Sequence, residues 1–321
     1  MLKPFRDRVN AVSVAVASAA VSSFYPTNAA VIMAVEPDTG RVHCGARADL
    51  DDFGAEFPEA LRSMVSQMPD AGAVVVVVFG SLDQARDSAA ALAVDLLVAV
   101  RVHMLVACTD DGVFVEEGGD FTEVCGVPLY ESDAFEAYES AGKATRRTRA
   151  DMMRSHKPLD GGARSALAGP IVDADLTMLT ADSPAELLRQ ADDLVARIGQ
   201  AAGAVTDADA AMLGALCLTT ARRDALIAAI DREDADAMAE ALRRLAVRLA
   251  GPDAVHVLAV CGLAYWISGR GALAGVVVEI AQQIGVRSTL LDMVDELRSS
   301  PVMNPAQVWP ALRSKVRATF E

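Results

Sequence analysis

Hydrophobic positions change their spacing along the chain, and this change divides the sequence into two parts. The first part alternates extended and helical segments. A continuous β-branched run, AVVVVVFG at 73–80, is typical of a strand buried on both faces of a sheet, and a helix over 58–68 precedes it. A helix is predicted over 81–101, with Asp83 near its start, and MLVAC at 104–108 is the next strand. These segments predict a right-handed β-α-β crossover.

Further elements of the first part are predicted from turn residues. VIMAV at 31–35 and RVHCGARADL at 41–50 flank EPDTG, whose turn chemistry favours a hairpin. Residues 110–120, DDGVFVEEGGD, are predicted to be turn-rich. Residues 132–157 are predicted as a helix that breaks near Gly142.

The N-terminal segment has two interpretations. KPFRDR followed by AVSVAVASAAV imitates the basic and apolar regions of a signal peptide. A first helix that leads through a turn at Pro26 into the buried strand explains the same residues. Serine, threonine, asparagine and proline residues interrupt 11–35, so no membrane span is predicted there.

From residue 183 onward, hydrophobic positions recur with helical period. The predicted helices cover 183–200, 206–230, 233–250, 254–268, 271–284, 288–299 and 305–319. Within 254–281 two apolar helices meet at Gly269. Gly269, Ala274, Val278 and Ala281 have the spacing of the turn and second helix of a tetratricopeptide unit. We expect a helical-repeat-like array, with an up-and-down bundle as the alternative.

Residues 158–182 separate the two parts and are rich in proline and glycine, which predicts a linker. The predicted fold is an α/β N-terminal domain over 1–157 with a mixed sheet, followed by an all-α, tetratricopeptide-like domain over 183–321. Two domains are the ordinary expectation for a chain of 321 residues.

Composition and charge restrict the partners. A net charge of −15 and a pI near 4.7 repel both a phosphate backbone and an anionic membrane, so we predict no nucleic-acid partner and no membrane partner. Five scattered cysteines without CxxC spacing favour reduced thiols in a cytoplasmic protein. The four histidines share no ligand spacing, and neither a metal nor a cofactor is predicted. With no familiar catalytic motif present, the sequence leaves open whether the protein is an enzyme.

Charged residues of the first domain suggest one candidate site. Arg47 and Asp49 lie two apart in a predicted strand and therefore on one face, where they either flank a polar ligand or form a structural ion pair. Arg146 and Arg149 belong to a basic run that either grips a phosphorylated ligand or forms a solvated helical face. Because α/β sheets place ligands at the carboxyl ends of parallel strands, we expect these four residues to bind a small phosphorylated molecule there.

The second domain suggests a groove for a protein partner. Arg222 and Arg223 interrupt an apolar helix, and buried charges need partners, so they either face a groove or form an interhelical salt bridge with Asp231 or Glu233 or with another helix. Tyr265 and Trp266 either anchor a partner or fill the core of the helical hairpin.

Eight blocks of the sequence resemble an uncharacterised actinobacterial family, domain of unknown function 4192, which is also met in actinophages. The blocks are FYPTNAAVIMAV (24–35), ARADL (46–50), AVVVVVFG (73–80), EVCGVPLYES (123–132), TRADMM (148–153), RRDALIAAI (222–230), GLAYWISGRGALAGVVVEIA (262–281) and NPAQVWPALR (304–313). The similarity covers about residues 11–315. It implies a cytoplasmic two-part protein of bacterial or phage source and no particular reaction.

Three functions are therefore expected, in order. The first is a cytoplasmic regulatory or protein-interaction module that uses a groove of the helical domain. The second is an enzyme or sensor for a small phosphorylated metabolite or nucleotide at the α/β domain. The third, a role in phage–host conflict, follows from the resemblance alone.

Overall fold

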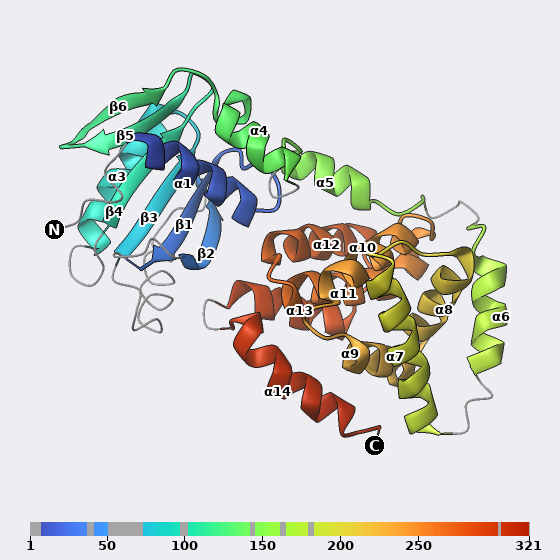
Figure 1. The fold of residues 1–321 in the computed structure, drawn as a ribbon. Coiled ribbons are helices and arrows are strands. Elements are labelled where there is room, and N and C mark those ends of the chain that lie inside the picture. Colours follow the sequence, from blue (N-terminus) through green and yellow to red (C-terminus); the bar gives the residue numbers. More distant parts are fainter. Residues whose placement is uncertain are drawn as a thin grey trace. The chain divides into compact units, whose positions relative to one another are not determined.

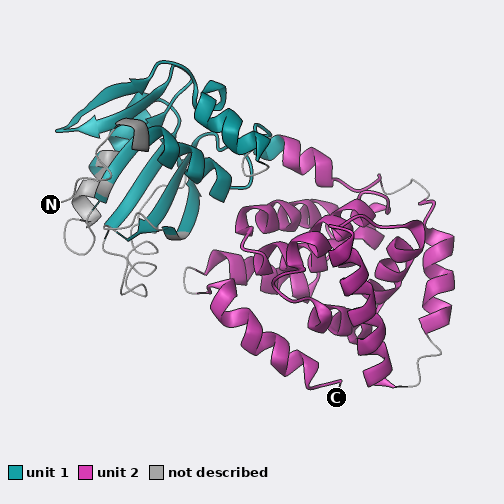
Figure 2. Ribbon diagram, viewed as in Figure 1, with its two compact units in different colours: residues 1–150 teal, residues 151–321 magenta. Residues whose placement is uncertain are grey.

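The computed structural model describes residues 8–36, 42–50, 73–96, 102–141, 145–160, 165–178, 183–300 and 303–320. The chain divides into two compact units, unit 1 over residues 1–150 and unit 2 over residues 151–321 (Figure 2). This division falls before the predicted domain end at residue 157, because α5 (Arg149–His156) packs within unit 2. Its Ser155 carbonyl accepts a hydrogen bond from Arg243 at 3.0 Å.

Six strands form one mixed sheet in unit 1, in the order β2-β1-β3-β4-β5-β6 (Figure 1). Their bounds are β1 Ala29–Val35, β2 Val42–Asp49, β3 Ala73–Phe79, β4 Val102–Cys108, β5 Val113–Glu117 and β6 Asp120–Cys125. β3 and β4 run parallel, and the other four neighbouring pairs run antiparallel. The helix α3 (Leu82–Leu96) connects β3 to β4. The predicted hairpin β1-β2 and the predicted β-α-β unit are therefore confirmed.

The two central strands, β1 and β3, are buried along their whole length. Because side chains alternate across a strand, each strand supplies two apolar faces. Val31 and Val75 contribute to the cluster beneath α1 (Arg8–Val21) and α4 (Asp133–Ser140). Ile32 and Val76 contribute to the opposite cluster with Ala85 of α3. The continuous valine run of β3 thus fills both interiors of the sheet.

The segment predicted to be turn-rich, 110–120, instead contributes to the hairpin β5-β6. Gly118 and Gly119 have φ values of +69° and +99°, as a two-residue hairpin turn of type I′ requires. The Glu116 carboxylate accepts a hydrogen bond from the Gly119 amide at 2.7 Å and so closes this turn. Two glycines between alternating segments are a hairpin signal, which the surrounding acidic residues obscured.

Two helix predictions of the first part have different outcomes. The predicted helix over 132–157 is present as two helices, α4 and α5, and Gly142 itself lies outside the described residues. The short 3-10 turn η2 (Leu129–Glu131) precedes α4, whose N-terminus is capped by the Ser132 hydroxyl. The predicted helix over 58–68 also lies outside the described residues.

Unit 2 is helical throughout its described residues. Its helices after α5 are α6 Ala168–Met178, α7 Pro184–Gln200, α8 Asp207–Leu218, α9 Thr220–Ala229, α10 Ala235–Ala246, α11 Gly251–Ile267, α12 Gly271–Ile284, α13 Thr289–Ser299 and α14 Pro305–Arg317. The predicted hairpin of α11 and α12 is confirmed, with Gly269 in the left-handed region at φ +85°. None of the described helices is long and apolar enough to cross a membrane.

The helix α11 occupies the centre of unit 2. Nearly all of its side chains are buried, and it contacts α8, α10, α12, α13 and α14 (Figure 1). In a helical-repeat array each repeat contacts its neighbours in sequence, whereas α11 also contacts helices that are distant in the chain. The contacts therefore resemble those of a cluster around one central helix and differ from the predicted array.

The predicted linker, 158–182, contains the helix α6. Gly169 and Pro170, which suggested a linker, lie in the first turn of α6, where proline is tolerated because its missing amide proton is not needed. Ile171 packs onto α8 at Gly214, where a Cβ atom would lie 2.7 Å from the Ile171 Cδ1 atom. The part of the predicted linker that forms α6 is therefore a packed helix of unit 2.

Candidate functional site

Three chain segments meet at one edge of the sheet in unit 1. Phe79 at the end of β3 is paired with Cys108 at the end of β4, because these two strands run parallel. Phe79 is also opposite Ala29, the first residue of the antiparallel strand β1. The carboxyl ends of β3 and β4 and the segment that enters β1 therefore lie together, at the position where open α/β sheets bind ligands.

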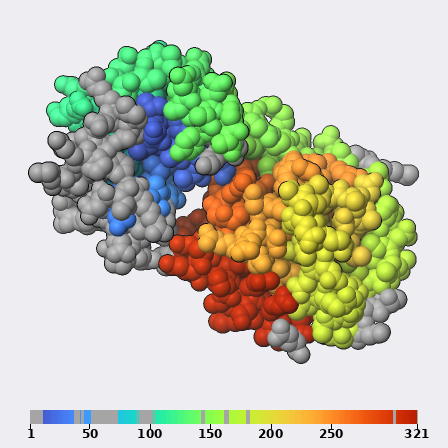
Figure 3. Space-filling view, viewed as in Figure 1, coloured from blue at the N-terminus to red at the C-terminus, as the bar shows by residue number. Residues whose placement is uncertain are grey.

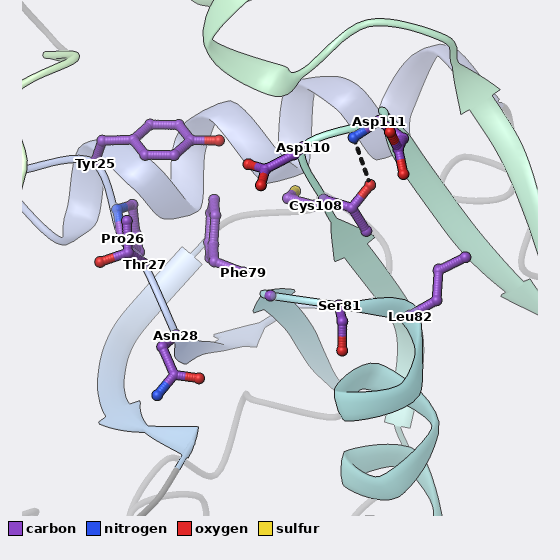
Figure 4. A pocket seen from close by; sticks show the side chains of 12 residues that line it. Tyr25, Pro26, Thr27, Asn28, Phe79, Ser81, Leu82, Cys108, Asp110 and Asp111 are labelled. Atoms are coloured by element: carbon purple, nitrogen blue, oxygen red, sulfur yellow. Dashed lines mark hydrogen bonds between the residues drawn. The ribbon is translucent and has the colours of Figure 1, made fainter.

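A cavity of about 480 Å³ is present at this edge (Figure 4). It is lined by residues 25–28 before β1, residues 79–82 between β3 and α3, and residues 108–111 after β4. Its volume lies within the range of ordinary small-molecule sites, roughly 300 to 1,000 Å³. The lining combines aromatic rings, hydroxyl groups, an amide and two carboxylates.

The side chain of Gln84 ties two of these segments together. Its Oε1 atom accepts a hydrogen bond from the Ser81 amide at 2.8 Å, while the Ser81 hydroxyl accepts one from the Gln84 amide at 3.2 Å. This reciprocal arrangement is a capping box at the start of α3. The Gln84 Nε2 atom also donates to the Asn28 Oδ1 atom at 2.7 Å. The entry to β1 is thus fastened to the N-terminus of α3.

Glycine at position 80 leaves the room that Gln84 needs. A Cβ atom there would lie 2.5 Å from the Gln84 Oε1 atom and 3.1 Å from the Leu50 Cδ1 atom. Asn28 has a left-handed backbone with φ +47°, a conformation that asparagine tolerates better than most residues. Its carbonyl accepts a hydrogen bond from the Leu50 amide at 3.0 Å.

Tyr25 forms an aromatic wall of the cavity. Its ring packs edge-on against Phe79, Tyr130 and Phe135, with ring centroids 5.4 to 5.8 Å apart. Its amide donates to the Arg147 carbonyl at 2.8 Å. Burial raises the pKa of the Tyr25 phenol well above its ordinary value, and the neighbouring Cys108, Tyr130 and Asp110 raise it further. The hydroxyl therefore keeps its proton at neutral pH.

The segment after β4 contributes a thiol and two carboxylates. Cys108 is 4% exposed, and burial followed by the proximity of Cys125 raises the pKa of its thiol far above the usual range. The Thr109 hydroxyl accepts hydrogen bonds from the amides of Asp111 at 3.0 Å and Gly112 at 3.1 Å (Figure 4). This turn presents the exposed side chains of Asp110 and Asp111 at the mouth of the cavity.

The residues predicted for this unit do not line the cavity. Arg47 and Asp49 form an ion pair at 2.5 Å on the edge strand β2, and the Arg47 guanidinium lies 5.4 Å from the centre of the Phe24 ring. The alternative of a structural ion pair is therefore what the structure shows. Arg146 pairs with Glu139 at 2.9 Å, and Arg149 is half-buried in the first turn of α5.

Three of the four residues predicted for a partner groove of unit 2 are buried. Arg222 is 7% exposed and pairs with Asp175 of α6, which is the predicted alternative of a salt bridge with another helix. Tyr265 and Trp266 are 3% and 2% exposed because they lie on the central helix α11.

The side chains of Tyr265 and Arg223 also make polar contacts. The Tyr265 hydroxyl lies 3.0 Å from the Nε2 atom of His156 on α5, so it holds two helices of unit 2 together. Arg223 is half-buried; its Nη2 atom lies 3.4 Å from the Thr220 hydroxyl, and its Nε atom has no partner in the described residues.

The sequence pattern predicted that a ligand binds at this edge of the sheet, but it did not predict the residues that line the cavity. The signals were short polar segments beside buried strands: Tyr-Pro-Thr-Asn before β1 and Thr-Asp-Asp-Gly after β4. Both segments have residues typical of turns, and the sequence therefore predicted turns and no ligand contacts there. Within the described residues, no group of three histidine, cysteine, aspartate or glutamate side chains could hold a metal ion.

Together these observations define a two-unit protein that has a ligand-sized cavity at the carboxyl ends of the parallel strands in its α/β unit. The chain belongs to the family described as domain of unknown function (DUF4192), which matches residues 20–298. No curated protein and no solved structure matches the chain.

Proposed function

We propose that unit 1 binds a small polar organic molecule in the cavity at the ends of β3 and β4. The observation that carries this proposal is the cavity itself, which has the volume and the position of a ligand site. Its lining is also held in place before any ligand binds, because Gln84 fastens Asn28 to the start of α3 and aromatic contacts fix Tyr25. Preorganised walls reduce the entropic cost of binding.

The lining supports binding more than catalysis. Cys108 and Tyr25, two lining groups that become nucleophiles when deprotonated, keep their protons at neutral pH because burial raises their pKa values. The other ionisable groups of the lining are the Asp110 and Asp111 carboxylates, and the lining holds no lysine, arginine or histidine that could stabilise an anionic transition state. The proposal is therefore a sensor or carrier function for unit 1. This proposal differs from the expectation that Arg146 and Arg149 contact a phosphorylated ligand, because neither residue lines the cavity.

A thermal-shift screen of small polar molecules tests this proposal on the full chain. A compound that binds only the folded protein at about 100 times its Kd stabilises it by about 2.7 kcal/mol, which raises Tm by several degrees. Thr27→Trp places a large side chain in the lining, and Thr177→Trp on the exposed face of α6 is the matched control.

The expected result is a set of compounds that stabilise the wild-type protein and the Thr177→Trp control but not Thr27→Trp. Compounds that stabilise all three proteins equally bind elsewhere and count against the proposal. A screen that gives no stabilising compound refutes it.

We also propose that unit 2 binds a protein partner, through α6. Val172 and Leu176 are 56% and 57% exposed, the highest values among the large apolar side chains of the described residues. They lie one turn apart on α6, a helix at the margin of unit 2 (Figure 3). Adjacent exposed apolar residues of this size mark interaction sites more often than they occur by chance.

The partner is proposed to be an amphipathic helix with basic residues beside its apolar face. α6 carries the exposed carboxylate of Asp173 and no basic residue, whereas Asp175 is paired with Arg222, so the exposed charge of α6 is negative and complements such a helix. A photo-crosslinking amino acid at position 172 should capture one predominant partner in cells, and the same group at Met293 of α13 is the control. Identical crosslinked species from both positions would contradict this proposal.

A further inference from the structure

The charges around the cavity are unbalanced. Asp110 and Asp111 contribute two carboxylates, and the residues that line the cavity include no lysine, arginine or histidine. Neither carboxylate forms an ion pair with any described residue, whereas Asp49 and Asp83 pair with Arg47 and Arg86. The cavity therefore holds negative charge that no side chain of the described residues neutralises through an ion pair.

The N-terminus of α3 opposes this charge only in part. A helix N-terminus is equivalent to roughly half a positive charge, and two amides of this one, those of Ser81 and Gln84, are already engaged in a capping box. Two carboxylates outweigh half a charge. A phosphate or carboxylate ligand would therefore meet net repulsion.

The exposed side chain of Asp110 borders the cavity, within reach of a bound ligand. Figure 4 shows its side chain and the Tyr25 hydroxyl directed toward the same part of the cavity. Asp110 is also one of the groups whose charge acts on the Tyr25 phenol, so the two side chains are near neighbours. A cation placed here would contact the Asp110 carboxylate and the hydroxyl oxygen of Tyr25 together, and both contacts favour it.

The opposite side of the cavity is polar and uncharged. Thr27, Asn28 and Ser81 supply hydroxyl and amide groups there, from the segments before β1 and before α3. Such groups suit the hydroxyl or amide portion of a ligand.

We propose that the ligand of this cavity is a small organic amine with a polar, uncharged remainder, and that its ammonium group binds Asp110 beside the ring of Tyr25. This inference rests on the proposed ligand-binding function of unit 1 and specifies its ligand class. Such an amine carries its charge on a carbon framework, which the Tyr25 and Phe79 rings can contact.

Two sets of probes, each with a cationic, a neutral and an anionic member on a related framework, test the inference by calorimetric titration of the full chain. The first set is glucosamine, glucose and glucuronate. The second is tyramine, its neutral alcohol tyrosol and 4-hydroxyphenylacetate. In at least one set the amine should bind about tenfold more tightly than the neutral member, the factor expected from one charge-assisted hydrogen bond, and the acid should not bind. The set that shows this order identifies the framework as sugar-like or aromatic.

Variants at Asp110 separate charge from shape. Asp110→Asn keeps the size of the side chain and should weaken amine binding about tenfold while leaving the neutral member unchanged. Asp110→Glu retains the charge and should restore the preference for the amine. Asp120→Asn, at an exposed position of the β5-β6 turn, is the matched control and should have no effect.

The outcomes distinguish this inference from the proposed function. If a neutral or acidic probe binds best, and Thr27→Trp abolishes that binding, the amine inference is wrong and the ligand-binding proposal stands. If neither amine binds at about 10 mM, well above the Kd of a weak fragment, the inference is also overturned. If binding of every probe survives Thr27→Trp, both are wrong.

Discussion

Replacing Gly80 with alanine should destabilise unit 1 only when Gln84 is present. The added Cβ atom would lie 2.5 Å from the Gln84 Oε1 atom, so the amide must move away. That movement breaks the hydrogen bonds to the Ser81 amide and to Asn28, at 2.8 and 2.7 Å. Each is worth about 1 kcal/mol, so the loss is about 2 kcal/mol.

The same substitution also stabilises the protein through the unfolded chain. Exchanging glycine for alanine at a compatible backbone conformation gains about 0.4 to 1 kcal/mol, and Gly80 is not among the residues with positive φ. The net effect of Gly80→Ala in the wild-type chain is then a destabilisation of about 1 kcal/mol. In a Gln84→Ala background the steric conflict with the amide is gone, and the substitution should be neutral or stabilising.

A double-mutant cycle measures this change of sign. Both tryptophans, Trp266 and Trp309, lie in unit 2, so their fluorescence does not report on unit 1. Hydrogen exchange of the β3 and β4 amides, followed by mass spectrometry, gives the opening free energy of unit 1 directly. Gly169→Ala is the control, because a Cβ there contacts nothing within 4 Å. An equal cost of Gly80→Ala in both backgrounds would refute the assigned role of Gln84.

Three further predictions concern buried charge, pH and thiol reactivity. Asp175→Asn leaves the buried guanidinium of Arg222 without its partner and should lower the unfolding free energy of unit 2 by about 2 kcal/mol in a urea titration followed by tryptophan fluorescence. Burial raises the pKa of Glu240, but hydrogen bonds and charges from Arg243 and Arg244 outweigh burial and lower it to about 2. The stability that Glu240 contributes is therefore present above about pH 4.5 and is lost as the pH falls toward 2, so Glu240→Gln should flatten this part of the pH profile of unit 2. Cys108 should react with iodoacetamide at pH 8 about tenfold more slowly than the half-buried Cys125, and a ligand in the cavity should slow it further.

Each of these predictions has a control and a result that contradicts it. Asp173→Asn removes an exposed carboxylate of α6, and an equal loss from this variant would show that the Arg222 pair has no special role. A wild-type pH profile that Glu240→Gln leaves unchanged would show that the pKa of Glu240 is not depressed. Peptide mapping that finds Cys108 labelled as fast as Cys125 would contradict its burial.

Elements with a strong hydrophobic pattern could be predicted from the sequence, because burial dictates their residues. β3 is a run of five valines between alanine and phenylalanine, and α11 and α12 are apolar almost all round. The hairpin β5-β6 was harder to identify because acidic residues occupy its exposed positions. The single predicted helix over 206–230 is two helices, since Thr219 adopts an extended backbone and its hydroxyl caps α9.

The location of the cavity could be predicted from the sequence, but the residues that line it could not. Strand ends define where ligands bind in an α/β sheet, and the order of strands follows from the β-α-β pattern. The β1 entry, however, reaches the site because β1 is inserted between β2 and β3, a pairing of segments distant in sequence. Conspicuous charges such as Arg47 and Arg222 instead satisfy partners within the fold.

Amide chemical-shift mapping of the full chain during titration with glucosamine or tyramine, whichever binds more tightly, tests the central claim most directly. The account predicts that the largest shifts fall on the lining residues that have an amide proton, 25, 27–28, 79–82 and 108–111, and disappear in Thr27→Trp. Largest shifts on unit 2, or shifts at the cavity that persist in Thr27→Trp, would contradict it.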